Sequence, residues 1–361
     1  MTHFHGSDLE KIEAAYGIKK ETIINFSSNV NPLGLSESIK TYLPQKIELI
    51  ASYPDRNYLS LRCAIGNYIH MDSENIIVGN GSTELISLCI KAISPKKSLI
   101  IGPTYSEYER EVGLCGGSSA YYPLQEKNEF EIDIMHLKNS LTTDLDLLVI
   151  CNPNNPTSTA ITTSVMKEIL IDCKKKNIFV LIDETYVEFV HDVNNVSAVQ
   201  LVHDHDNVMV IRGVSKFFAA PGLRLGYAVC SSRSHILNIE RQKNPWTINA
   251  LAAFAGELML MDKEYILKTH QHIADERKKI VTTLSKWDFV KFIDPVANFV
   301  LVKILNESFN ASKLFNALLE RKLMIRDASS FPFLDEQYFR FCFLHSAQND
   351  LLLKSIEEIL K

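Results

Sequence analysis

The sequence lacks paired cysteines. Its seven cysteines, at positions 63, 89, 115, 151, 173, 230 and 342, include no pair with the C-x-x-C spacing of metal and redox motifs. The eleven histidines show no zinc-type spacing either. Scattered cysteines of odd number indicate reduced, mostly buried thiols, so we expect a cytoplasmic protein without a metal site.

Long apolar runs are also absent. No stretch approaches the ~20 apolar residues that a membrane span requires. Residues 1–8 contain no basic segment followed by an apolar one, so we expect neither membrane contact nor a signal peptide. The formal charge of −5 gives no reason to expect a nucleic-acid partner. The composition, 46% hydrophobic and 22% charged, is typical of a globular protein.

What the sequence does contain is an alternation of apolar strands and helices from about residue 52 to 230. This pattern predicts an α/β fold with a mostly parallel sheet covered on both faces. We expect an N-terminal arm over 1–35 and a large domain over 36–245, built on seven strands. Residues 246–361 are expected to begin with one long linking helix, from near 249 to about 284, and to continue as a smaller α/β domain.

Polar clusters follow five of the expected strands. Ligands of such sheets bind at the carboxyl ends of the strands, so these clusters predict one shared site. The clusters are Gly79–Glu84, Pro103–Tyr105, Asn152–Thr157, Asp183–Tyr186 and Gly213–Lys216.

Lys216 stands among small and apolar residues. A buried lysine is costly unless its charge is paired or removed, and burial lowers its pKa. A neutral amine is a nucleophile that can form a Schiff base with an aldehyde. For this residue alone, a surface lysine in a glycine-rich turn is the alternative.

The other clusters also allow two interpretations each. Gly79–Glu84 leads from a strand into a helix, which suits either an anion site or an ordinary helix cap. Asp183 follows an apolar strand and is either the partner of a protonated ring nitrogen or a helix cap. Tyr105 either stacks on a flat ring or is simply half-buried.

The order of the motifs resembles that of the fold-type-I pyridoxal-phosphate enzymes, the class I and II aminotransferase superfamily. The matching motifs are Gly79-Asn80-Gly81-Ser82-Thr83, Asn152-Pro153-Asn154-Asn155-Pro156-Thr157, Asp183-Glu184-x-Tyr186, Ser215-Lys216-Phe217 and Gly222-Leu223-Arg224-Leu225-Gly226. The resemblance implies pyridoxal 5'-phosphate as cofactor, joined to Lys216 and paired with Asp183 at its ring nitrogen. It assigns the remaining cofactor contacts to Gly81, Ser82, Thr83, Ser215 and Arg224 near the phosphate, Asn155 and Tyr186 at the ring hydroxyl, Tyr105 on the ring face, and Tyr53 from the other subunit of a homodimer.

Further segments resemble threonine-phosphate decarboxylases of cobalamin biosynthesis, which are themselves similar to histidinol-phosphate aminotransferases. These segments are His5-Gly6, Asn25–Gly34, Tyr53-Pro54-Asp55, Pro245–Ala253 and Ser346–Asn349. The resemblance implies decarboxylation of L-threonine O-3-phosphate to (R)-1-amino-2-propanol O-2-phosphate. Transamination of histidinol phosphate or of another amino acid is the alternative. A non-enzymatic relative is disfavoured because Lys216 and Asp183 are both present.

The same resemblance suggests how a phosphorylated amino-acid or amine substrate is held. Arg340 and Asn29 are expected to bind its carboxylate, and Arg326, with His5, Gly6 and Ser7, is the candidate for its phosphate. Three positions depart from the family pattern. Gly213 replaces a residue that usually carries a hydroxyl, Ser158 replaces a common glycine, and Leu344 replaces a second arginine that is frequent in the decarboxylases.

Overall fold

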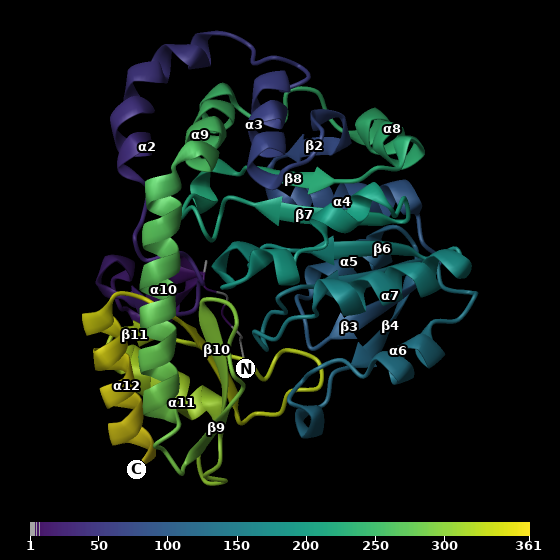
Figure 1. The fold of residues 1–361 in the computed structure, drawn as a ribbon. Helices are drawn as coiled ribbons and strands as arrows, with labels where there is room; N and C mark the ends of the chain where they lie inside the picture. Colours follow the sequence, from purple (N-terminus) through teal and green to yellow (C-terminus); the bar gives the residue numbers. More distant parts are fainter. Residues whose placement is uncertain (1–3, 5, 7) are drawn as a thin grey trace.

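A computed structural model describes residues 4, 6 and 8–361, and it contains two main β-sheets with helices packed on them (Figure 1). The larger sheet has the strand order β2-β8-β7-β6-β5-β3-β4. Its strands are β2 (Ile76–Gly79), β3 (Lys97–Gly102), β4 (Ser118–Pro123), β5 (Leu147–Cys151), β6 (Phe179–Asp183), β7 (Val208–Gly213) and β8 (Gly226–Val229). Of these seven strands, β8 alone runs in the opposite direction, so its pairings with β2 and β7 are antiparallel and the predicted, mostly parallel seven-stranded sheet is confirmed.

Helices cover both faces of this sheet, which explains why its central strands are apolar throughout. In β5, Leu148 and Ile150 pack in one core cluster, while Leu147 and Val149 pack in another on the opposite face. The first cluster includes α3 (Leu59–Ile69), α6 (Ile134–Ser140) and α7 (Thr163–Lys175), and the second includes α4 (Gly81–Ile93), α5 (Glu107–Leu114) and α8 (Arg233–Gln242).

The smaller sheet is antiparallel, with the order β12-β13-β10-β9. Its strands are β9 (Val290–Phe292), β10 (Phe299–Ile304), β12 (Arg326–Asp327) and β13 (Tyr338–Cys342), and its helices are α11 (Ala311–Glu320) and α12 (Ser346–Leu360). The N-terminal segment joins this part of the molecule, because β1 (Ile24–Asn25) pairs in parallel with β11 (Leu323–Met324). Before β1, α1 (Leu9–Tyr16) ends at Gly17, which has a φ of 70°.

The connection between the two sheets differs from the expected single helix. It consists of α9 (Ala250–Met261) and α10 (Lys263–Leu284), separated by Asp262. Asp262 leaves the helical conformation, and its carboxylate accepts a hydrogen bond from the backbone N–H of Tyr265. Aspartate is a strong helix N-cap, so this residue starts a new helix where hydrophobic periodicity alone predicted continuity. In Figure 1, α10 runs from the end of α9 to the smaller sheet.

The first helices of the larger part, α2 (Glu37–Tyr42) and the 3-10 segment η2 (Pro44–Ala51), pack on α9. Among the residues that the structure describes, no helix has the length and apolar character needed to cross a bilayer.

Candidate active site

Lys216 lies just beyond the end of β7, and its amine donates a hydrogen bond of 2.7 Å to the backbone carbonyl of Ser28. Burial lowers the pKa of Lys216 to about 8, and the positive charges of Arg340 and Arg224 act in the same direction. With this pKa, roughly 10–20% of the lysine amines are neutral between pH 7 and 7.4, far more than for an ordinary lysine. The expected nucleophilic amine is therefore chemically available here.

Asp183 ends the neighbouring strand β6 and is buried. One of its carboxylate oxygens accepts hydrogen bonds from the N–H (2.9 Å) and hydroxyl (2.6 Å) of Thr185, and the other accepts one from the Tyr108 hydroxyl (2.7 Å). Burial raises the pKa of Asp183, whereas these three hydrogen bonds oppose that rise. The carboxylate is thereby fixed in orientation at the carboxyl end of the sheet.

Tyr108 was not anticipated from the sequence. It lies three residues after Tyr105, in the first turn of α5, so the two rings meet edge to face with 5.7 Å between centroids. No helical spacing indicated this contact in the sequence, because Tyr105 precedes α5 and only Tyr108 lies within the helix. Burial raises the pKa of Tyr105 to about 12, so its hydroxyl stays protonated.

Arg340, on β13 of the smaller sheet, joins the two parts of the site. Its guanidinium donates to the side-chain oxygen of Asn155 and, at 2.7 Å, to the carbonyl of Ser27. Arg340 is 5% exposed, and its Nε has no hydrogen-bond partner among the described residues. The side-chain amide of Asn29 donates to the hydroxyl of Tyr186 at 3.2 Å, while the amide oxygen of Asn29 has no such partner.

The N-terminus of α4 lies against Arg224. Gly81, the first residue of this helix, has a φ of 79°, and a Cβ there would overlap the Arg224 guanidinium. A Cβ on Gly226 would lie 2.7 Å from the backbone nitrogen of Ser82, so both glycines permit close approach. The N–H groups of Gly81, Ser82 and Thr83 belong to the first helical turn, which leaves them without intrahelical partners. Helix dipole, free N–H groups and a guanidinium together form an anion site.

A second buried arginine, Arg326, lies next to Arg340 in the smaller sheet. Arg326 on β12 is the register partner of Arg340 on β13, and it is 4% exposed. Its guanidinium donates to the Ser330 hydroxyl at 2.8 Å and to the carbonyl of Phe4. Burial, together with the positive charge of Arg340, lowers the pKa of Arg326 to about 10.

The described part of the N-terminal arm reaches the same region. The carbonyl of Gly6 accepts a hydrogen bond of 2.7 Å from the Asn25 side chain, and a Cβ on Gly6 would lie 2.5 Å from the Ser28 Cα. Glycine is therefore required for this contact. His5 and Ser7 lie outside the described residues. Tyr53 is 83% exposed and packs on Trp246, so within one chain it is not part of the buried cluster.

The three departures from the family pattern have different consequences. Ser158 has a φ of 61°, which explains why glycine is common there, and its hydroxyl accepts a 3.0 Å hydrogen bond from the N–H of Ala297. A Cβ on Gly213 would lie at ordinary van der Waals distance from Ser82, so the backbone there has room for a side chain. Leu344 is buried and adds no charge near Arg340.

The cluster suits a ligand with several negative charges. Lys216, Arg224 and Arg340 bring three cations together, against the carboxylate of Asp183. The donor set also fits pyridoxal phosphate: an anion site at α4, an oriented carboxylate for a ring nitrogen, and an amine of lowered pKa for an aldehyde. The amide oxygen of Asn29 and the Nε of Arg340 are buried without a hydrogen-bond partner among the described residues. Buried polar atoms are normally hydrogen-bonded, so these two atoms are available to a ligand.

Residues 21–356 match the model of the family described as aminotransferase class I and II. The chain belongs to this family. Its members depend on pyridoxal phosphate, so the predicted family, cofactor and enzyme class are confirmed.

Two curated relatives match this enzyme over nearly their whole length. A protein of Caldanaerobacter subterraneus, provisionally named a threonine-phosphate decarboxylase, is 38% identical over 91% of this chain and 88% of its own. The threonine-phosphate decarboxylase of Salmonella typhimurium is 31% identical over 99% of this chain and 96% of its own.

Solved structures of both predicted activities have the same fold. The histidinol-phosphate aminotransferase from Clostridium acetobutylicum superposes with a TM-score of 0.87 at 33% identity, covering 92% of this chain and 98% of the other. The L-threonine-O-3-phosphate decarboxylase from Porphyromonas gingivalis gives a TM-score of 0.82 at 26% identity, covering 94% and 99%.

Proposed function

We propose that this enzyme decarboxylates L-threonine O-3-phosphate to (R)-1-amino-2-propanol O-2-phosphate and CO2. The two decarboxylase relatives support this choice. The observation that carries this proposal is a pair of buried arginines. Arg326 and Arg340 are register partners on the neighbouring strands β12 and β13, beside the Lys216 cluster. Two arginines in addition to Arg224 suit a substrate that brings both a carboxylate and a phosphate to the site.

The cofactor-binding roles follow the chemistry of each side chain. We assign the cofactor phosphate to the α4 N-terminus and Arg224 (residues Gly81, Ser82, Thr83 and Arg224, with Ser215), and the ring nitrogen to Asp183. The ring hydroxyl is assigned to Asn155 and Tyr186, and one ring face to Tyr105. Lys216 would hold the cofactor aldehyde until the substrate amine replaces it. When bound, pyridoxal phosphate would supply an electron sink for the pair of electrons released at the substrate Cα.

The residues of the chain then decide which Cα bond breaks. Arg340 and Asn29 hold the carboxylate, and Arg326 with the arm around Gly6 holds the phosphate. Fixing both anionic groups sets the orientation of the Cα bonds, and a small misplacement would change the reaction. After CO2 departs, the Lys216 amine holds the proton that replaces it on Cα.

Transamination of histidinol phosphate is the second candidate. It is favoured by the TM-score of 0.87 and 33% identity with the Clostridium acetobutylicum enzyme. Histidinol phosphate has no carboxylate, so in that reaction Arg340 would serve the 2-oxo acid instead.

A dimer completes the proposed site. Tyr53 packs on Trp246 and is exposed, and Ile47 and Ile50 of the neighbouring η2 are exposed as well. We propose that this face meets a second copy and that Tyr53 reaches the partner's cofactor phosphate. The seven free cysteines support a cytoplasmic location, and the arm (1–35), large domain (36–245) and small domain (246–361) remain our proposed division.

One experiment separates the two reactions. The purified enzyme, loaded with pyridoxal phosphate, is incubated with L-threonine O-3-phosphate without any 2-oxo acid, and CO2 is measured. We expect stoichiometric CO2 and none from Lys216→Ala. Absence of CO2, together with turnover of histidinol phosphate that requires 2-oxoglutarate, would reject the decarboxylase.

A further inference from the structure

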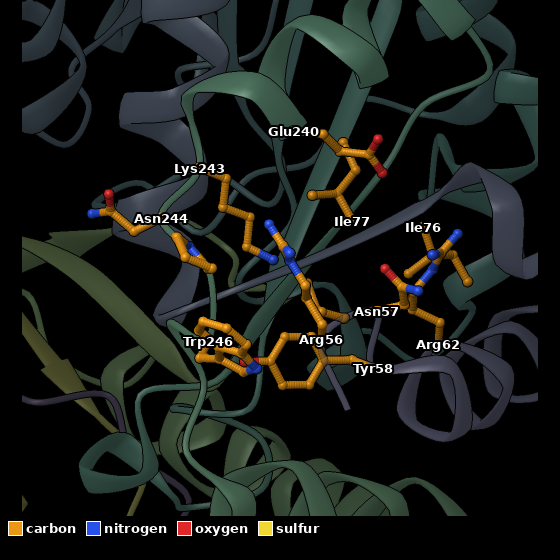
Figure 2. Close-up of a pocket in the computed structure, with 12 residues that line it drawn as sticks. Arg56, Asn57, Tyr58, Arg62, Ile76, Ile77, Glu240, Lys243, Asn244 and Trp246 are labelled. Atoms are coloured by element: carbon orange, nitrogen blue, oxygen red, sulfur yellow. The ribbon is translucent and has the colours of Figure 1, made fainter. Parts of the chain in front are cut away.

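Two groups of polar side chains lie outside the residues assigned to cofactor and substrate. One lines the cavity of about 230 Å³ that Figure 2 shows, and its Trp246 packs on Tyr53. Because Tyr53 is proposed to reach the second subunit, this cavity belongs to the shared site. The other group surrounds Asn298, which directly precedes β10 and is 0% exposed.

Asn298 contacts the N-terminal segment beside Lys216. The carbonyls of Ser27–Asn29 each accept a hydrogen bond, from Arg340, Lys216 and the side-chain amide of Asn298 in that order, at 2.7, 2.7 and 3.0 Å. Arg340 and Lys216 are also the groups proposed to meet substrate and cofactor, so ligands compete for them. Asn298 has no such second role. Its hydrogen bond is therefore the one of these three that persists when the site is filled.

This hydrogen bond holds Asn29 in an unfavourable backbone conformation. The φ of Asn29 is 55°, in the left-handed region that few residues other than glycine adopt, and the residue is 1% exposed. The side chain of Asn29 makes one hydrogen bond, of 3.2 Å, to the Tyr186 hydroxyl. The direction of this side chain therefore depends on the backbone being held, and Asn298 holds its carbonyl.

Asn298 is in turn fixed by the residues around it. The N–H groups of Val296–Ala297 donate to the carbonyl and the hydroxyl of Ser158, both at 3.0 Å. The carbonyls of the same two residues accept from Arg277 of α10, at 2.7 and 3.0 Å. The carbonyl of Asn298 accepts from the N–H of Phe343 at 2.8 Å. The segment before β10 is thus held by the larger part of the molecule, by α10 and by the smaller part.

We infer that Asn298 is a positioning residue, which holds Ser27–Asn29 so that the Asn29 side chain faces the substrate carboxylate. The inference rests on the proposed function, in which Asn29 binds that carboxylate. Packing alone does not explain an asparagine here, because its side-chain oxygen is buried without a partner among the described residues. An apolar side chain of the same shape would avoid that unfavourable burial. The position therefore uses the amide as a donor to Asn29.

Hydrogen–deuterium exchange of the holoenzyme tests this contact directly. Asn298→Leu removes the donor and keeps a side chain of similar shape. Peptides that cover residues 26–31 should exchange faster in this variant, because the segment loses the contact that persists in the loaded enzyme.

Asn207→Leu is the matched control. Asn207 precedes β7, at the opposite end of that strand from the active site, and its amide donates to the carbonyls of Leu170 and Ile178 at 3.1 and 3.4 Å. Like that of Asn298, its side-chain oxygen has no partner among the described residues. The control should leave exchange of residues 26–31 unchanged.

Kinetics provide a second measurement. L-threonine O-3-phosphate carries the carboxylate, whereas the product (R)-1-amino-2-propanol O-2-phosphate lacks it. Asn298→Leu should lower kcat/KM for the substrate by about tenfold, because a misplaced group beside the reacting bonds costs rate steeply, and should leave the inhibition constant of the product within about twofold. Ser158→Ala keeps Asn298 but removes one contact of Ala297, so it should change exchange and kcat/KM in the same direction by less.

The outcomes separate a positioning role from a purely structural one. Unchanged exchange in Asn298→Leu would overturn the inference, as would equal weakening of substrate and product or equal effects of Asn207→Leu. A wild-type enzyme that releases no CO2 would reject the proposed function instead. In that case, faster exchange of residues 26–31 confined to Asn298→Leu would still support Asn298 as the residue that holds this segment.

Discussion

Restoring a hydroxyl at position 213 should strengthen cofactor binding. A Cβ built on Gly213 lies 3.5 Å from the Leu225 carbonyl oxygen and 3.8 Å from the Ser82 hydroxyl oxygen, which are ordinary van der Waals distances. Gly213 ends β7 in extended conformation, so serine fits without backbone strain. The new hydroxyl would stand beside Ser82, at the anion site of α4.

The size of the effect follows from the charge of the phosphate. A hydrogen bond to a charged group contributes roughly 1.5–3 kcal/mol. Since each 1.4 kcal/mol is a factor of about ten, Gly213→Ser should lower the dissociation constant for pyridoxal phosphate by about tenfold to a hundredfold. Equilibrium dialysis of the cofactor-free protein measures this constant directly.

Gly213→Ala is the matched control for this experiment. It adds the same Cβ without the hydroxyl, so its dissociation constant should stay within about twofold of the wild type. If serine and alanine change the constant equally, the effect belongs to the Cβ and the reasoning about the missing donor is refuted.

Three further predictions concern the surroundings of the site. Tyr108→Phe removes one hydrogen bond from Asp183, which should raise the pKa of that carboxyl further and weaken cofactor binding about tenfold in equilibrium dialysis; unchanged affinity would contradict the role of this contact. Ser158→Ala leaves the N–H of Ala297 unpaired and should cost about 1–3 kcal/mol in urea unfolding, whereas Ser158→Gly should cost less because glycine relieves the positive φ. In the cofactor-free protein the folded-state pKa of Lys216 is lowered to about 8 from 10.5, so the unfolded chain binds more protons between these values and stability should rise with pH across that window. The rise should be smaller in Lys216→Met, and an identical pH profile for both proteins would show that the lysine is not buried as described.

The sequence predicted the elements that depend on local pattern. Near-continuous apolar strands indicated the larger sheet, and Asp183 and Lys216 were placed correctly at strand ends because parallel strands bring their carboxyl ends to one edge. The local pattern did not predict the contacts that join distant parts of the chain at the site. Lys216 meets the carbonyl of Ser28 across 188 positions, and Arg340 meets Asn155 across 185. Such contacts depend on how separate units pack, which no local periodicity records.

The pairing of Arg326 and Arg340 shows how function shapes this packing. Like charges directly opposite each other on neighbouring strands are destabilising, and here both side chains are also buried. Asp327 and Asp8 offset part of the charge of Arg326, while the positive charge of Arg340 helps to lower the pKa of Lys216. The arrangement therefore remains short of negative charge until ligands supply it. A cofactor phosphate at Arg224 and a substrate with a carboxylate and a phosphate would neutralise the three arginines. The empty site is destabilised by these unpaired charges, and binding of a substrate with two anionic groups would remove that destabilisation and so contribute to its affinity.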